Sequence, residues 1–261
     1  TGSGAGSDAI IEGDSLIEMG NIERGLSNYV SAHASYDAAL LLYQEHAHVS
    51  GEGVAHERLG SVCRIQGKHD EASQHFQHSL RLSRSIGDRQ QEGVSLGGLA
   101  TSLLDQGRFQ AALEHYELAL AIHRDLGDKR GEGTILGTMG ITCAAQGHVD
   151  IALEHFEAAL AIQVAIGDKP AQGLLHGNMA NALRNTGQLH VAIGHYQRAI
   201  DILRVIGDRG NEGLTRGNLG LALHRLGKLD EARAMLEEAI QICGDSVPLA
   251  EGACCGSLAQ I

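Results

Sequence analysis

The chain has 261 residues, of which 43% are hydrophobic, and it carries a formal net charge of −12 at pH 7. The hydrophobic content suffices for a continuous core and argues against wholesale disorder. The acidic balance argues against a nucleic-acid partner or an acidic membrane surface, because phosphate recognition needs a basic surface. No apolar run approaches the roughly 18–20 residues that span a bilayer, so we expect no membrane insertion.

The first residues, 1–8, are rich in glycine and serine and lack an initial methionine. This composition is typical of a linker or a cleavage product, and we expect the fold to begin after it. We also expect the chain to be part of a longer protein, because a final unit cut short would leave apolar surface uncovered.

Glycine-aspartate turns recur along the chain at a period of forty residues. The copies are Gly87–Gly93, Gly127–Gly133, Gly167–Gly173 and Gly207–Gly213. A fixed period of this size is the signature of a stacked repeat protein. Between residues 9 and 243 we predict six repeats, at 13–52, 53–92, 93–132, 133–172, 173–212 and 213–243. Residues 244–261 are predicted to form a partial seventh repeat or a capping helix.

Each repeat has the pattern of two helices joined by a tight turn. In the fourth repeat, Asp128 can cap the first helix by accepting hydrogen bonds from its free amides. Gly147 and Gly167 can end the first and second helices, because glycine adopts the left-handed conformation that closes a helix. Buried positions of the first helix recur at a spacing of three or four residues: Leu136, Met139, Gly140 and Cys143.

Small and large residues alternate in columns across the repeats. One column is small, with Gly60, Ala100, Gly140, Ala180 and Gly220, and a second column is alanine, with Ala72, Ala112, Ala152, Ala192 and Ala232. Between them stands one large residue in each repeat: Tyr36, Phe76, Tyr116, Phe156, Tyr196 and Leu236. We assign these columns to packing between helices about 8–10 Å apart, and we predict an all-α fold.

These columns resemble the tetratricopeptide repeat. In that family, small residues at the eighth and twentieth positions are followed by an aromatic residue and then by a further small residue. Gly140, Ala152, Phe156 and Ala159 match this pattern. The resemblance covers residues 13 to about 243. It departs from the family in its period of forty instead of about 34, in lacking the terminal proline, and in the residue near the start of each repeat: His56, Leu96, Leu136, His176 or Arg216.

The forty-residue form is similar to Pins-type spindle-orientation adaptors and to the repeat arrays of bacterial signalling kinases and ATPases. The resemblance implies a right-handed superhelical solenoid of helix-turn-helix repeats. It also implies that the first helices line a concave groove that binds an extended or helical peptide. The lysines with which chaperone-type repeats clamp a terminal carboxylate are replaced by glycines, which permit close approach by a helix or a ligand: Gly97, Gly137, Gly177 and Gly217.

Polar groove positions concentrate in the fifth and sixth repeats. The resemblance makes six of them candidate peptide-binding residues: Asn178, Asn181, Arg184, Asn218, His224 and Arg225. Asn178 and Asn218 occupy the position at which the family often bonds a peptide backbone, and an amide can both donate and accept. Arg184 and Arg225 would favour acidic groups. The alternative, a solvated face with no partner, stays open.

Fifteen histidines invite a metal interpretation, which the spacing opposes. One column holds His75, His115, His155 and His195, one to a repeat. Neighbouring repeats would separate these rings by about 10 Å, whereas zinc needs nitrogens about 2 Å from one centre. We therefore expect no metal and no cofactor, and assign the column to a packed or pH-sensitive seam.

The five cysteines are odd in number and match neither a disulfide framework nor a zinc site. We expect a reducing, cytoplasmic location. No catalytic residues stand out, so we predict a non-catalytic scaffold that binds a protein or peptide segment in the groove. An alternative function is an architectural array that regulates an attached kinase or ATPase domain. Self-association through Leu249–Ile261 is a further expectation.

Overall fold

The computed structural model of the chain describes residues 3–243, and these form helices and the turns that join them, without a strand. This confirms the predicted all-α class and its helix-turn-helix repeats. The first helix begins at Ser3, inside the segment 1–8 that the sequence assigns to a linker. The predicted partial seventh repeat at 244–261, and with it the predicted self-association, lies outside the described residues.

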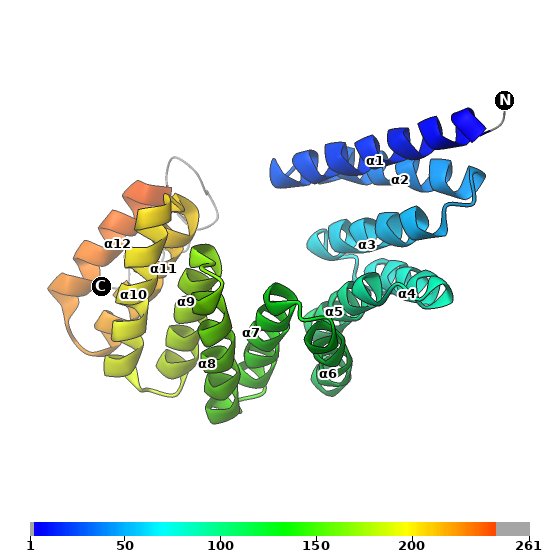
Figure 1. The fold of residues 1–261 in the computed structure, drawn as a ribbon. Helices are drawn as coiled ribbons and strands as arrows, with labels where there is room; N and C mark the ends of the chain where they lie inside the picture. The colour runs from blue at the N-terminus through cyan, green and yellow to red at the C-terminus, as the bar shows by residue number, and fades with distance from the viewer. Residues whose placement is uncertain (1–2, 244–261) are drawn as a thin grey trace. The chain divides into compact units, whose positions relative to one another are not determined.

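Two units divide the chain, Thr1–Gly131 and Glu132–Ile261. The helices that belong to unit 1 are α1 (Ser3–Gly25), α2 (Tyr29–Glu45), α3 (Val49–Ile65), α4 (His69–Ile86), α5 (Arg89–Asp105) and α6 (Phe109–Asp125). Unit 2 begins within α7 (Lys129–Ala145) and continues with α8 (Val149–Ala165), α9 (Lys169–Asn185), α10 (Leu189–Ile206), α11 (Arg209–Arg225) and α12 (Leu229–Cys243). Within each unit the helices follow one another in chain order (Figure 1).

A residue with positive φ closes the helices at intervals of twenty residues. From Gly67 to Gly227 all nine are glycines, with φ between 68° and 83°. Ser27 and Ala47 hold the same place in the first repeat, with φ of 62° and 51°. Glycine adopts this left-handed conformation without steric cost, whereas a residue with a side chain does not. The turns of the first repeat are therefore the strained members of a regular series.

The first helix of most pairs is capped by aspartate. The Oδ1 atoms of Asp88, Asp128, Asp168 and Asp208 each accept a hydrogen bond from the amide three residues later, at 2.9–3.1 Å. At α3 the cap is His48, whose Nδ1 accepts from the amide of Gly51 at 3.2 Å. The caps at the starts of α2, α4, α6, α8 and α10 make no such side-chain bond. The sequence prediction of an aspartate cap at these turns is confirmed.

The aromatic column packs onto the small column, as predicted. A Cβ atom placed on Gly140 would lie 2.6 Å from the ring of Phe156, and one on Gly20 would collide with the ring of Tyr36. Both rings are buried, with at most 1% of their surface exposed. Glycine is required at these two positions because the ring of the partner helix occupies the space of a side chain.

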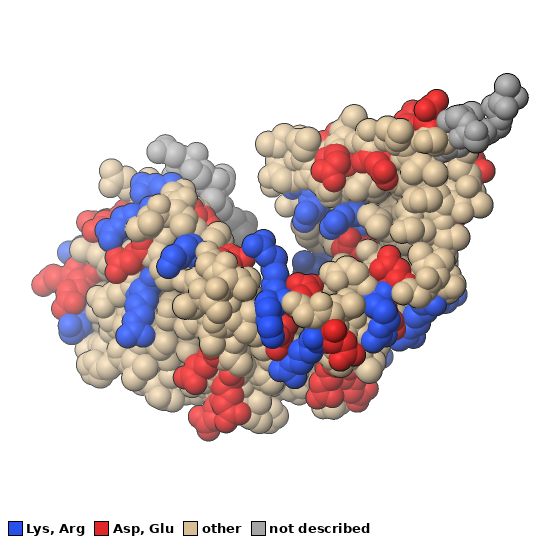
Figure 2. Space-filling view, in the orientation of Figure 1, with Lys and Arg blue, Asp and Glu red and all other residues tan. Residues whose placement is uncertain are grey.

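First helices of successive pairs touch one another: α1 contacts α3, α3 contacts α5, and α9 contacts α11. Within each unit, residues forty apart on these helices therefore lie side by side, which positions the candidate site. On the face that Figure 2 shows, acidic and basic side chains are interspersed over each unit. No described helix is both long and apolar enough to cross a bilayer.

Candidate functional site

A pocket of about 170 Å³ lies between α9, α10 and α11, and we call it the α9–α11 pocket. The residues that line it are Gly173, Leu174, Gly177, Asn178, Asn181, Tyr196, Leu203, Asn211, Leu214, Thr215 and Asn218. Three of the six predicted groove residues, Asn178, Asn181 and Asn218, are among them. The pocket forms because the first helices of two successive pairs run side by side with glycine at positions 173 and 177.

The three asparagines differ in how their amides are engaged. Asn181 accepts a hydrogen bond at Oδ1 from the hydroxyl of Tyr196, at 2.7 Å. Asn218 accepts at Oδ1 from Nη1 of Arg184, at 2.9 Å, which leaves its NH₂ group without a partner among the described residues. Asn178 makes no side-chain hydrogen bond within the described part of the chain. Burial raises the pKa of Tyr196 to about 12, so its hydroxyl stays protonated and donates at neutral pH.

The predicted arginines lie at the edge of the pocket and not on its lining. Nη1 of Arg184 donates a hydrogen bond to Oδ1 of Asn218, which lines the pocket. Nη1 of Arg225 donates to the backbone oxygen of Arg184 at 3.4 Å. The Nε of Arg184 is buried and has no hydrogen-bond partner in the structure. His224, the sixth predicted residue, stands near the end of α11 and is not among the lining residues.

Tyr196 belongs to the aromatic column, for which the sequence predicts only a packing role. The structure adds a second role, because each tyrosine of the column donates its hydroxyl to the polar residue fifteen positions earlier. Tyr36 bonds Asn21 at 2.9 Å, and Tyr116 bonds Thr101 at 2.9 Å. In the fourth repeat the column residue is Phe156, which has no hydroxyl, and the residue fifteen positions earlier is the apolar Ile141. The presence of tyrosine instead of phenylalanine in the column is the feature of the sequence that could have indicated these hydrogen bonds.

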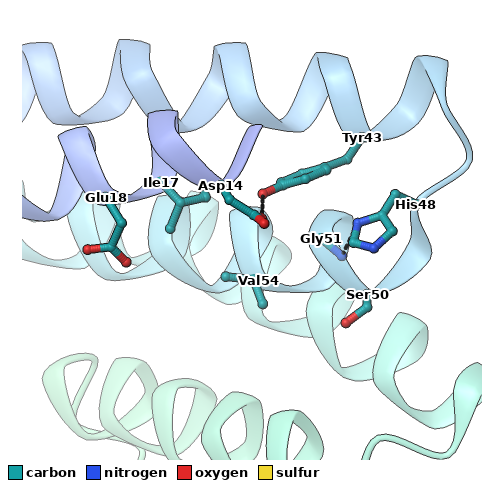
Figure 3. Close-up of a pocket in the computed structure, with 8 residues that line it drawn as sticks. All are labelled: Asp14, Ile17, Glu18, Tyr43, His48, Ser50, Gly51 and Val54. Atoms are coloured by element: carbon teal, nitrogen blue, oxygen red, sulfur yellow. Dashed lines mark hydrogen bonds between the residues drawn. The ribbon is translucent and has the colours of Figure 1, made fainter. Parts of the chain in front are cut away.

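A second pocket of about 210 Å³ occupies the same repeat position in unit 1, between α1, α2 and α3, and we call it the α1–α3 pocket (Figure 3). Its lining residues are Asp14, Ile17, Glu18, Tyr43, His48, Ser50, Gly51 and Val54. The hydroxyl of Tyr43 donates to Oδ1 of Asp14 at 2.7 Å. Burial and the Asp14 carboxylate raise the pKa of Tyr43, so this hydroxyl also stays protonated. This pocket was not predicted from the sequence.

Two histidine pairs that were not predicted from the sequence form inside the helix pairs, and each joins one member of the histidine column to a histidine outside it. The Nδ1 atoms of His56 and His75 lie 3.0 Å apart, and those of His176 and His195 lie 3.1 Å apart. At that distance one Nδ1 donates its hydrogen and the other accepts it. Burial, together with the neighbouring histidine, lowers the pKa of His56 and of His176 to about 4.

The partners of these pairs explain why the sequence missed them. His56 and His176 stand where the family usually has a large residue near the start of the repeat, and their partners belong to the separate histidine column. Packing of the two helices joins the columns only in the repeats where both are histidine. Among the described residues no group of three or more histidine, cysteine or acidic side chains is arranged to hold a metal.

The sequence profile of the tetratricopeptide repeat matches residues 11–85, 51–125, 91–163 and 172–245, which together cover most of the chain. The chain belongs to the tetratricopeptide repeat family. No curated protein matches the sequence.

Among solved structures, the fold is similar to aspartyl phosphate phosphatase F from Bacillus subtilis, with 16% identity and a TM-score of 0.70 over 89% of this chain. The chain spans 60% of that protein's length. It is also similar to a signal-transduction ATPase with a tetratricopeptide repeat sensor from Pyrococcus horikoshii, with 16% identity, a TM-score of 0.73, and coverage of 91% of this chain and 37% of that one.

A third similar structure is the Rap conjugation gene regulator of the plasmid pLS20 in complex with the Phr* peptide. The identity is 18% and the TM-score 0.73, over 94% of this chain and 68% of that one. At these identities the likeness establishes the fold alone.

Proposed function

We propose that this chain, arranged as six repeats between residues 9 and 243, is a non-catalytic protein-interaction module. It binds an extended peptide or protein segment along the first helices, and it is anchored at the α9–α11 pocket. A cytoplasmic location is part of the proposal. The observation that carries it is the convergence of Asn178, Asn181 and Asn218, which come from two different helices, on one pocket.

The free amide groups of the pocket suit a peptide backbone. Asn178 offers both its carbonyl and its NH₂ group, and Asn218 offers its NH₂ group. A peptide bond presents one donor and one acceptor, which such amides satisfy without reading the side chain. Gly177 leaves open space beside them, because nothing lies within 4 Å of a Cβ atom placed there. A backbone therefore has room to approach α9 closely.

The arginines at the edge give this pocket a preference for acidic ligands. The guanidinium of Arg184 is held by Asn218, and its buried Nε has no partner among the described residues. Arg225 is exposed and adds a second positive charge next to it. Charge-assisted hydrogen bonds to a carboxylate are about twice as strong as neutral ones. We expect an acidic side chain or a terminal carboxylate next to the peptide bond that the asparagines hold.

A catalytic role is disfavoured by what lines the pocket. The lining of the α9–α11 pocket contains no histidine, cysteine or carboxylate. A general base near its working pKa is therefore missing from it. The similar structures support binding: one holds the Phr* peptide, and another carries its repeats as a sensor. The name phosphatase attaches to a third, and nothing in this pocket supplies the groups for phosphate chemistry.

The test is selection of peptides from a random display library on the chain, followed by fluorescence polarisation with the selected peptides. We expect the double variant Asn178→Ala with Asn218→Ala to weaken binding about 5- to 150-fold, since each of two lost hydrogen bonds contributes about 0.5–1.5 kcal/mol. The matched control is Gln241→Ala, which removes an exposed amide from α12 in the same unit.

Unfolding curves of both variants show whether the loss comes from the site or from the fold. If the selected peptides bind the double variant as tightly as the unchanged chain, the groove proposal is wrong. Selection that returns no binding peptide at all would count against it equally.

A further inference from the structure

One face of α1 is apolar and exposed, and we call it the α1 stripe. Its residues recur every three or four positions, which places them on one side of the helix: Ile11, Ser15, Met19, Ile22 and Leu26. The amide of Leu26 donates to the carbonyl of Ile22 at 3.0 Å, so the helical turn continues to the end of the stripe. The four large apolar side chains are between 50% and 68% exposed. Within unit 1, α1 is the helix at the edge (Figure 1).

Other first helices bury the positions that α1 exposes. The counterparts of Met19 on α3, α5, α9 and α11 are at most 4% exposed: Leu59, Leu99, Met179 and Leu219. The counterparts of Ile22 on the same helices are equally buried: Val62, Ser102, Ala182 and Ala222. Ile22 itself is 64% exposed.

A second helix covers these positions in each of the four cases. The second helix of the preceding pair contacts the first helix, as α2 does with α3, α4 with α5, α8 with α9, and α10 with α11. On α11, Leu219 and Ala222 share one core with Tyr196 and Ile200 of α10. No described helix takes this place on α1. The repeat therefore indicates what fits the α1 stripe, namely a helix that presents apolar side chains at a spacing of three or four.

The edges of the α1 stripe are acidic. Glu12 and Glu18 are exposed on its two sides, and Asp8 is exposed near its start. None of the three forms an ion pair with a basic residue of the described chain. The single basic residue of α1, Arg24, lies on the opposite side, next to the hydroxyl of Tyr36. Complementary charge across an interface selects the partner, so the helix that fits here has basic edges.

We propose that the α1 stripe binds an amphipathic helix of another protein, with lysine or arginine on both sides of its apolar face. The helix takes the position that the preceding second helix takes on α3, α5, α9 and α11. Its anchors are apolar residues at a spacing of three or four, as in other helices that bind an apolar surface. The proposal does not depend on the α9–α11 pocket, which lies in unit 2, so its failure would leave the proposed function standing.

Two other occupants fit the stripe less well. A second copy of the chain would bring its own Glu12 and Glu18 against those of the first, and like charges across an interface oppose association. Residues 244–261 contain two acidic residues and no lysine or arginine. They therefore offer no basic side chain to the acidic edges.

The probe for the test is a blocked peptide with the sequence of α10, a second helix that covers the equivalent face of α11. Lysine replaces Gln197 and Ile202, which flank the buried face of α10 on its two sides. Nuclear magnetic resonance of labelled methionine methyl groups in the whole chain follows binding. We expect a saturable shift of the Met19 signal, whereas Met179, at the same repeat position but covered, should not shift.

Three further peptides test the chemistry of the partner. The unmodified α10 sequence should bind more weakly than the lysine peptide, and the peptide with glutamate at positions 197 and 202 should bind most weakly. A peptide with the residues of the lysine peptide in an order without helical periodicity should leave Met19 unshifted. Binding of the lysine peptide should weaken as salt is added.

Variants of the chain test the stripe itself. Ile22→Gln should weaken binding of the lysine peptide about 5- to 30-fold, because the contact of one large apolar side chain is lost. Leu41→Gln, at an exposed leucine of α2 outside the stripe, is the matched control and should change nothing. Glu12→Gln combined with Glu18→Gln should weaken binding about two- to tenfold, the range of two exposed charge pairs. Glu154→Gln, at an exposed carboxylate of α8, should have no effect.

Several results would overturn the proposal. These are an unshifted Met19 signal with the lysine peptide, equal shifts with the peptide that lacks periodicity, and equal binding by the Ile22→Gln variant. Sedimentation of the chain alone tests the second copy, since a dimer that Ile22→Gln dissociates would assign the stripe to self-association instead. A shift of the Met19 signal on Leu258→Gln in the whole chain would assign the stripe to residues 244–261.

Discussion

The α1–α3 pocket and the α9–α11 pocket occupy the same place in the repeat and differ in nearly every side chain that faces the ligand space. Both lie between the first helices of two successive pairs, and in each the second helix between them supplies a buried residue, Tyr43 in one and Leu203 in the other. One pocket carries two carboxylates, and the other carries amides with arginines at its edge. The repeat therefore fixes where a pocket forms, and the residues between the packing columns fix its chemistry.

The first prediction concerns a packing feature that both units share, the histidine pair. The pKa of His56 and of His176 is lowered to about 4, whereas an unfolded histidine titrates near 6.5. The unfolded chain therefore takes up protons that the folded chain does not. The contribution of each pair to the free energy of unfolding is fully present above pH 6.5. It is lost as the pH falls towards 4, by about 2–3 kcal/mol at each pair.

Urea unfolding at a series of pH values checks this expectation. His56→Leu should flatten the pH dependence that comes from unit 1, and His176→Leu should do so for unit 2. His190→Gln, at an exposed histidine of α10, should leave the slope as it is. A chain that is equally stable at pH 7 and pH 4.5 would show that the pairs carry no such cost.

The second prediction tests whether the packing frame is equally tight in the two units. Gly20→Ala in unit 1 and Gly140→Ala in unit 2 each drive a Cβ atom into an aromatic ring. Each should destabilise the chain by about 1–2 kcal/mol, since overpacking outweighs the gain in helix propensity. Gly194→Ala meets nothing within 4 Å and should instead stabilise α10 by about 0.5–1 kcal/mol. Thermal unfolding measures all three, and a neutral Gly140→Ala would contradict the close approach of α7 and α8.

The smallest effect is expected at the turn before the α1–α3 pocket. Ala47 has a φ of 51°, where its counterpart Gly207 has 76°. Ala47→Gly should relieve strain and raise the free energy of unfolding by about 1 kcal/mol. The reverse change, Gly207→Ala, should lower it by a similar amount. If Ala47→Gly destabilises the chain, the turn owes its stability to contacts of the alanine methyl group, which would overturn this account of the strain.

The helices, their caps and their packing columns could be predicted from the sequence because they recur in successive repeats. The period of forty, the aspartate caps and the match of Gly140 with Phe156 each recur, and each recurrence strengthens the same assignment. Three asparagines of the α9–α11 pocket followed from the family resemblance. His224 is not among the lining residues, although its neighbour Arg225 reaches the backbone of Arg184 on α9.

Features that exist in one or two repeats escaped the sequence analysis. The histidine pairs require two columns to meet across a helix interface, and neither column alone indicates a partner. The α1–α3 pocket lies in the repeat that departs most from the pattern, with His48 in place of aspartate and Tyr43 where the fifth repeat has Leu203. Asp14 and Glu18 there are exposed charges of α1, and the sequence alone does not indicate that they line a pocket.

The hydrogen bonds from tyrosine hydroxyls to residues of the first helices allow ligand binding to be followed by intrinsic tyrosine fluorescence. The chain has no tryptophan, and four of its five tyrosines donate to a residue of α1, α5 or α9. Tyrosine emission therefore dominates the fluorescence of the protein and originates beside the row of helices where a ligand would lie. A molecule that takes Asn181 away from Tyr196, or Asp14 away from Tyr43, changes the hydrogen bond of a fluorophore without any attached label.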